Sequence, residues 1–169
     1  PLSNLSSFSE QLQQRGYTPN SRWLRREVVA ADADEQLALG LSPGARVARL
    51  ERLRLADEVV MAYETSVIPA SVLPDPQAVD RSLYAHLERG GQMPVRALQH
   101  IRAMNASTQL AHQLGVPEGQ AVLFITRVGY LESGVAVELT HSYCRSDYYD
   151  FVAELRRAPA SAYLHNPME

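Results

Sequence analysis

The feature that most constrains the fold of this chain is an internal repeat. The segment LGLSPG at 39–44 is matched by LGVPEG at 114–119, an offset of 75 residues. The same offset aligns Arg52 with Arg127, and an offset one residue shorter aligns Glu64 with Glu138. A repeated supersecondary unit fixes the architecture, so we predict two halves, each made of a strand, a short helix and a hairpin. Together they give an α+β fold, an antiparallel sheet of about six strands with flanking helices and an internal two-fold repeat.

Local patterns place the individual elements. Alternating apolar residues between turn signals predict strands at 22–30, 46–55, 59–68, 95–104, 121–131 and 135–145. Capping residues and glycine stops predict helices at 8–15, at 33–39 after Asp32, at 83–87 after Asp80, at 110–114 after Ser107, and at 147–156. Pro69, Pro74 and Pro76 predict a stretch without regular structure.

Size and charge narrow the class of protein. With 169 residues the chain is expected to form a single domain over 1–169. Its net charge of −3 and the lack of a basic stripe argue against a segment that grips nucleic acid by itself. No apolar run is long enough for a membrane span, and the start lacks the layout of a signal peptide, so we expect a cytoplasmic protein without membrane contacts.

Two arginines are the clearest candidates for a binding site. Arg52 and Arg54 are two residues apart on one predicted strand, so both side chains leave the same face of the sheet. Paired guanidinium groups can clamp a phosphate or carboxylate. Glu64, on the other strand of the hairpin, is expected on that face too. The alternative is an exposed sheet face with ordinary Arg/Glu cross-strand pairs.

The first helix offers a second anion site. Its start gathers the amides of Phe8 and Ser9 and the hydroxyls of Ser6, Ser7 and Ser9, where the helix dipole is positive. A plain helix cap is the alternative. If the fold brings Arg52 and Arg54 to this helix start, all of these groups would hold one phosphate.

Other chemistry is not indicated. Five histidines are scattered without metal-ligand spacing, and P-loop, dinucleotide-binding and Gly-x-Ser-x-Gly motifs do not occur, so we expect no metal and no cofactor. The single cysteine, Cys144, and His141 fall on opposite faces of a strand, which disfavours a Cys/His nucleophile. Cys144 is expected to be a buried thiol.

Several motifs together resemble the UTRA domain, the effector-binding half of HutC-branch GntR transcription regulators. They are LSSFSE (5–10), RGYTP (15–19), RLRLAD (52–57), MAYETS (61–66), SLY (82–84) and RSDYYDF (145–151). The resemblance covers about residues 3–156. It implies the fold of chorismate lyase, a homodimer, and an N-terminal winged helix-turn-helix before Pro1 through which alone the protein would contact DNA.

The most similar branch is the amino-sugar regulators, which bind hexosamine 6-phosphates. By this resemblance the segment 6–9 with Arg52 and Arg54 would hold the phosphate. The residues expected to contact the sugar are Glu64, Ser82, Tyr84 and Glu138. That branch carries a tyrosine where this chain has Cys144, and Tyr143 is expected to point to the other face.

The resulting prediction is a ligand-sensing domain of a bacterial transcription regulator, a repressor, that binds a small phosphorylated metabolite, a sugar or amino-sugar phosphate, and has no enzymatic activity. A chorismate-lyase-like enzyme on the same fold is the alternative, because an Arg and a Glu in a buried pocket can also bind a carboxylated ring. A dimerisation module without a ligand is a third.

Overall fold

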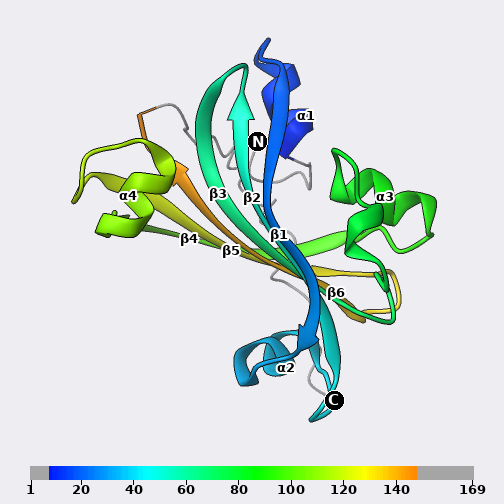
Figure 1. The fold of residues 1–169 in the computed structure, drawn as a ribbon. Helices are drawn as coiled ribbons and strands as arrows, with labels where there is room; N and C mark the ends of the chain where they lie inside the picture. The colour runs from blue at the N-terminus through cyan, green and yellow to red at the C-terminus, as the bar shows by residue number, and fades with distance from the viewer. Residues whose placement is uncertain (1–7, 148–169) are drawn as a thin grey trace, which may run out of the picture.

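Six antiparallel strands form one sheet in the order β1-β2-β3-β6-β5-β4 (Figure 1). The computed structural model describes residues 8–147. The strands are β1 (Pro19–Ala30), β2 (Arg46–Ala56), β3 (Val59–Pro69), β4 (Arg96–Asn105), β5 (Ala121–Tyr130) and β6 (Ala136–Arg145). The helices are α1 (Phe8–Gln14), α2 (Ala33–Leu39), the 3₁₀ turn η1 (Pro76–Ala78), α3 (Leu83–Arg89) and α4 (Thr108–Leu114). The predicted α+β class is confirmed.

The repeat is visible in the topology. Each half consists of a strand, a helix and a hairpin, as β1-α2-β2-β3 and β4-α4-β5-β6. The two halves have the same strand order from the edge of the sheet to its centre, β1-β2-β3 and β4-β5-β6. Both short helices end at a left-handed glycine, Gly40 with φ 62° and Gly115 with φ 66°. Glycine adopts this conformation without steric cost, which explains why the repeated Leu-Gly stop was recognisable in the sequence. The two halves meet where β3 pairs with β6.

Helices cover both faces of the sheet. Leu12 of α1 packs with Met61, Ala62 and Cys144, and α3 packs with Leu50 and other side chains of the same face. The opposite face is covered by α2 and α4. In Figure 1, α1 and α3 lie to the right of the sheet and α4 to the left. A central strip on the α1/α3 face is therefore left between two apolar clusters.

Several local predictions are corrected by the structure. Ser82, not Asp80, caps α3, because the Ser82 hydroxyl accepts the N–H of Ala85. The proline stretch is not wholly irregular: Asp75 accepts the N–H of Gln77 and starts η1 with proline in its first turn. β1 begins at Pro19, three residues early, because β2 continues to Ala56 and pairs with it, and an edge strand tolerates proline. Except for Asp147, which lies in a turn, the helix predicted at 147–156 falls outside the described residues.

The register also corrects one pairing of the repeat. Each hairpin contains a register shift, after Arg54 in β2 and after Gly129 in β5, at equivalent positions. The residues opposite them, Ala62 and Glu138, are therefore structural equivalents, and Glu64 corresponds to Thr140 instead of to Glu138. The β5–β6 connection (131–135) is longer than the β2–β3 connection (57–58). After the turn of the hairpin, the number of residues between equivalent positions of the two halves is therefore larger than before it. The sequence alignment predicted a smaller number.

Candidate functional site

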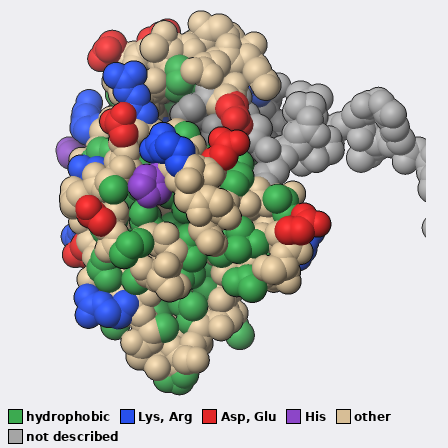
Figure 2. All heavy atoms as spheres, turned by 90° about the vertical axis from the view of Figure 1, so that its right-hand side faces the viewer, with side chains coloured by type: hydrophobic (Ala, Val, Ile, Leu, Met, Phe, Trp, Pro, Cys, Tyr) green, Lys and Arg blue, Asp and Glu red, His purple; other side chains and the backbone are tan. Residues whose placement is uncertain are grey.

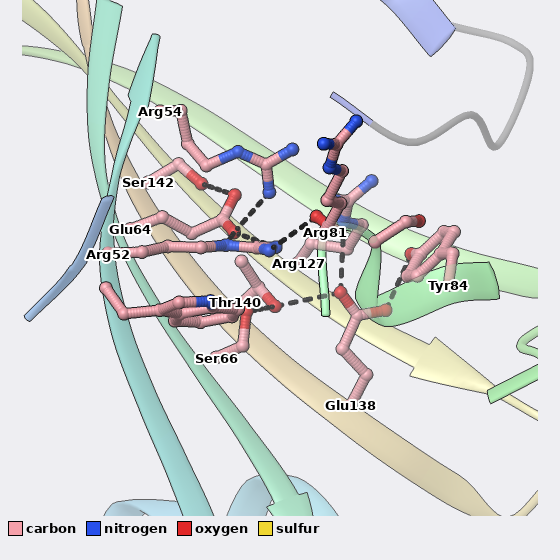
Figure 3. Close-up of polar contacts among 12 residues, drawn as sticks. Arg52, Arg54, Glu64, Ser66, Arg81, Tyr84, Arg127, Glu138, Thr140 and Ser142 are labelled. Atoms are coloured by element: carbon pink, nitrogen blue, oxygen red, sulfur yellow. Dashed lines mark hydrogen bonds and ion pairs between the residues drawn. The ribbon is translucent and has the colours of Figure 1, made fainter. Parts of the chain in front are cut away.

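The central strip between the two apolar clusters is a polar pocket. Its lining residues come from β2, β3, β5, β6 and the start of α3, and the space they enclose, including its mouth, is about 290 Å³. They are Arg52, Arg54, Glu64, Ser66, Ser82, Leu83, Tyr84, Arg127, Glu138 and Thr140. Figure 3 shows these side chains converging above the sheet from separate strands. Local strand periodicity produces the convergence, since residues two apart share a face.

One end of the pocket is a buried charge triad. Arg52 donates from Nε to Oε1 of Glu64 at 2.8 Å, and Arg54 donates to the same oxygen at 3.1 Å (Figure 3). Ser142 donates to Oε2 at 3.3 Å. The three charged residues are 3–4 % exposed. The predicted shared face is confirmed, whereas the alternative of an exposed face with solvated pairs is wrong.

The electrostatics of this triad follow from burial and from its shared carboxylate. Burial alone would raise the pKa of Glu64, but the positive charges of Arg52 and Arg54 outweigh it and lower the pKa to about 2. Burial and then the neighbouring Arg52 lower the pKa of Arg54 to about 10. Two guanidinium groups share one carboxylate, so these three residues together carry a formal charge of +1.

The other end of the pocket carries a carboxylate. Glu138 is 1 % exposed and accepts from the hydroxyl of Tyr84 at 2.6 Å and from that of Thr140 at 2.8 Å (Figure 3). Arg127 lies 3.5 Å from Glu138. Burial and then the charge of Glu138 raise the pKa of Tyr84, so the phenol stays protonated and acts as a donor.

The two halves of the repeat differ in charge at the pocket. Arg54 with Ala62 at one end correspond to Gly129 with Glu138 at the other. A Cβ at Gly129 would lie 2.8 Å from Oε2 of Glu138 and 3.1 Å from the ring of Pro94. The glycine therefore leaves the room that the Glu138 carboxylate occupies. The equivalent cross-strand pair thus contributes a cation from β2 in one half and an anion from β6 in the other, which makes the pocket electrically polar.

The structure brings most of the predicted site residues together. Arg52, Arg54, Glu64, Ser82, Tyr84 and Glu138 all line the pocket. Phe8 and Ser9 belong to the first turn of α1, but their side chains, and Ser6 and Ser7 altogether, lie outside the described part of the molecule. Whether the 6–9 segment reaches the pocket therefore stays a prediction.

Four lining residues were missed, the apolar Leu83 and three polar ones for which signals existed. Arg127 was aligned with Arg52 by the repeat, and the equivalent face follows from that alignment. Ser66 is two residues from Glu64, and Thr140 two from Glu138, so both share the site face. Ser66 and Thr140 bond to each other at 3.0 Å across the β3–β6 pair.

The remaining sequence predictions concern Cys144 and its neighbour. Cys144 is buried, as predicted. It packs against Leu12, and burial raises the pKa of its thiol to about 12. Tyr143 points to the other face, where its ring stacks 4.7 Å from that of Phe124. In the described range, no group of three or more His, Cys, Asp or Glu side chains is placed to hold a metal ion, and no helix is long and apolar enough to cross a membrane.

Among the described residues, the face of the molecule that carries α3 has no continuous basic patch (Figure 2). Figure 2 views the molecule from the side on which α3 lies in Figure 1, and basic and acidic side chains are interspersed there around a largely apolar centre. The excess positive charge of Arg52, Arg54 and Arg127 is instead held inside the pocket.

The fold and the site together define the class of protein: an α+β domain with a charge-lined pocket at the centre of its sheet. Residues 14–150 match the model of the UTRA domain, and the chain belongs to that family. The resemblance drawn from the sequence motifs is confirmed.

The relatives are transcription regulators. The chain is 36 % identical over 161 residues to the HTH-type transcriptional repressor NagR of Bacillus subtilis, covering 92 % of this chain and 65 % of NagR. It is 29 % identical to the HTH-type transcriptional regulator GgaR of Escherichia coli K12, covering 90 % of this chain and 62 % of GgaR. The chain thus spans less than two thirds of the length of these curated relatives.

Solved structures show the same fold. The effector domain of PhnF from Mycobacterium smegmatis superposes with a TM-score of 0.85 at 27 % identity, covering 91 % of this chain and 97 % of that one. A GntR-family transcriptional regulator from Enterococcus faecalis V583 gives a TM-score of 0.74 at 28 % identity, covering 80 % and 99 %.

Replacing Gly129 by alanine tests how tightly the carboxylate end is built. The new Cβ would overlap Oε2 of Glu138, which cannot move without losing its bonds to Tyr84 and Thr140. We expect Gly129→Ala to lower the free energy of unfolding by about 1–3 kcal/mol, as overpacking does. Chemical denaturation measures it. Gly90→Ala is the control, because its Cβ would meet only ordinary contacts at 3.6 Å or more, and equal losses in both variants would contradict the packing argument.

The Glu64 triad predicts a pH dependence of stability. Because the folded-state pKa of Glu64 is about 2, below its ordinary 4.5, the ionised form stabilises the fold above pH 4.5 and that contribution is lost as the pH falls towards 2. The shift corresponds to a contribution on the order of 3 kcal/mol. We expect wild type to lose that much more than Glu64→Gln between pH 5 and 2 in denaturant titrations. The surface carboxylate Glu27, paired with Arg25 in solvent, supplies the control Glu27→Gln, which should follow wild type.

Proposed function

We propose that this domain is the ligand-sensing part of a transcription regulator and that its pocket binds a small phosphorylated metabolite, a sugar or amino-sugar phosphate. The observation that carries the proposal is the polarity of the pocket. Arg52 and Arg54 give one end a net positive charge, while Glu138 gives the other end a carboxylate. A ligand with an anionic group and, some ångströms away, hydroxyl or amino donors matches both ends.

The charges support an anionic ligand. Three arginines and two glutamates line the pocket, so its formal charge is +1 before a ligand enters. A phosphate can accept hydrogen bonds from planar guanidinium groups with good geometry. Ser66, Ser82 and Tyr84 add hydroxyls to the lining of the pocket. Ser82 already accepts a backbone N–H with its hydroxyl oxygen, which leaves its proton for a ligand oxygen.

The relatives add support for the ligand class and the regulatory role. They are named as regulators, and one at 28 % identity is the repressor of a mannosyl-D-glycerate transport/metabolism system in Escherichia coli. A sugar carrying one anionic group has the chemistry that this pocket fits. We extend the proposal to a DNA-binding domain at the N-terminal side, as the names of the relatives suggest. We also propose the 6–9 segment as a further contact of the phosphate, because α1 packs on the pocket face through Leu12.

The enzymatic alternative is tested by the fate of the ligand. A lyase-like activity would use the same Arg and Glu groups, so pocket chemistry alone does not separate the two. The regulator names of the relatives favour binding without turnover. Mass spectrometry of a candidate ligand after long incubation with the protein should recover it unchanged, and a time-dependent product would favour the enzyme.

Removing Arg54 is the direct test of the site. The ligand is first identified by thermal shift with glucosamine 6-phosphate, N-acetylglucosamine 6-phosphate, glucose 6-phosphate and mannosylglycerate, and its affinity is measured by calorimetry. We expect Arg54→Ala to weaken binding by about 1.5–3 kcal/mol, more than tenfold, as for a lost hydrogen bond to a charged group. Glu64 keeps Arg52 as its partner, so the variant should still fold.

Arg49 is the matched control for that variant. It lies on the same strand but faces α2 and pairs with Glu35 at 2.7 Å. Arg49→Ala should bind the ligand as wild type does. Wild-type affinity in Arg54→Ala, or an equal loss in Arg49→Ala, would place the ligand elsewhere.

We also propose that the protein acts as a homodimer, because two-fold DNA sites are read by two-fold proteins. Sedimentation of this chain at high micromolar concentration should detect a dimer. A monomer under those conditions would count against it.

A further inference from the structure

Trp23 lies beside the pocket rather than in its wall, and its ring faces the guanidinium of Arg52. The two residues are direct partners across the β1–β2 pair, and the guanidinium carbon of Arg52 lies 4.9 Å from the centre of the indole ring. This is within the range of a cation–π contact. Trp23 is also the single tryptophan of the chain.

Trp23 is itself held in place from two sides. Its indole Nε1 donates to the backbone oxygen of Asp80 at 3.3 Å, and Arg26 lies 4.9 Å from the same ring. Arg26 is fixed by bonds to the backbone oxygens of Gln77 and Val79, at 3.2 and 3.0 Å. The ring therefore has a fixed orientation set by β1 and by the segment that leads into α3.

The contact determines which parts of Arg52 remain for a ligand. A guanidinium group forms hydrogen bonds at its edges and stacks with its faces. Arg52 uses Nε and one terminal nitrogen for Glu64, at 2.8 and 2.6 Å, and directs the other towards the backbone oxygen of Arg81 at 3.5 Å. The guanidinium carbon lies over the Trp23 ring, so this contact restrains the group without consuming a hydrogen-bond donor.

We propose that Trp23 is a positioning residue for the end of the pocket formed by Arg52, Arg54 and Glu64. It holds the Arg52 guanidinium in the plane in which its edge meets both Glu64 and the anionic group of the ligand. This rests on the proposed function for its ligand, but the orientation of Arg52 exists without one. Because Trp23 touches Arg52, ligand capture also changes the charge environment of the only indole.

Two substitutions separate the aromatic face from mere bulk. Trp23→Phe keeps a ring to stack on Arg52, whereas Trp23→Leu keeps an apolar side chain without one. With glucosamine 6-phosphate as the probe, we expect Trp23→Leu to bind roughly threefold to thirtyfold more weakly than Trp23→Phe, the range of a cation–π contact. Tyr130→Leu removes a similar stack with Arg96, at 4.2 Å, outside the pocket lining, and should bind as wild type does.

Two further readouts do not depend on affinity changes in a weakened fold. In wild type, tryptophan emission should change with the same midpoint as calorimetry, and the change should be largely lost in Arg52→Lys, which keeps the charge but not the flat face. Without any ligand, hydrogen exchange of the Arg52 Nε–H, followed by NMR, should be several-fold faster in Trp23→Leu than in wild type and in Tyr130→Leu.

The outcomes distinguish this inference from the proposed function. If the wild type binds no sugar phosphate or other anion, the proposed function fails, and the exchange of the Arg52 Nε–H still tests the positioning role. If wild type binds but Trp23→Leu and Trp23→Phe bind equally well, or if Arg52 exchange is the same in wild type and Trp23→Leu, Trp23 does not position Arg52 and the inference is overturned while the ligand site stands.

Discussion

The structure depends on one buried carboxylate, Glu64, that two arginines of the neighbouring strand share. Taking three charges out of water is costly, and their mutual attraction offsets that cost only with good geometry and further hydrogen bonds. Here the geometry is supplied by β-sheet register, which places Glu64 opposite Arg52 and two residues along the strand from the partner of Arg54, and Ser142 supplies a further bond. Replacing the triad by apolar residues would make a simpler core, so retaining it points to a use for the charges.

The sheet supplies that use through a broken repeat. Two similar halves bring two sets of equivalent positions to the centre, and at these positions the side chains differ in charge. Where β2 and β3 carry Arg54 and Ala62, β5 and β6 carry Gly129 and Glu138. A symmetric pocket would suit a symmetric ligand, whereas this one has a cationic end and an end where the Glu138 carboxylate pairs with Arg127. The fold is therefore general, and the charge asymmetry of the pocket lies in two equivalent cross-strand pairs, Arg54 with Ala62 and Gly129 with Glu138.

Much of this arrangement could be predicted from the sequence, for identifiable physical reasons. Strand periodicity placed Arg52 and Arg54 on one face, and the Leu-Gly stops revealed the repeat because only glycine takes the left-handed conformation easily. The equivalence of Glu64 and Glu138 was wrong because it depended on connection lengths, which local patterns do not determine. The burial of the arginines could not be predicted either, since it depends on α1 and α3 packing at either end of the strip.

The polarity of the pocket also has a consequence for how a ligand acts. The residues that line the pocket carry a formal charge of +1, and burial and the neighbouring Arg52 lower the pKa of Arg54. On the proposed function, an anion that binds the folded form would stabilise it according to its concentration relative to Kd. The strands and helices that meet at the pocket then share that stabilisation: β1 through Trp23, α3 through Tyr84, and the β3–β6 seam through Ser66 and Thr140. Because these elements belong to both halves of the sheet, we propose that a ligand bound in the pocket would act on both halves, and that β1 is the route from the pocket to a DNA-binding domain at its N-terminal side.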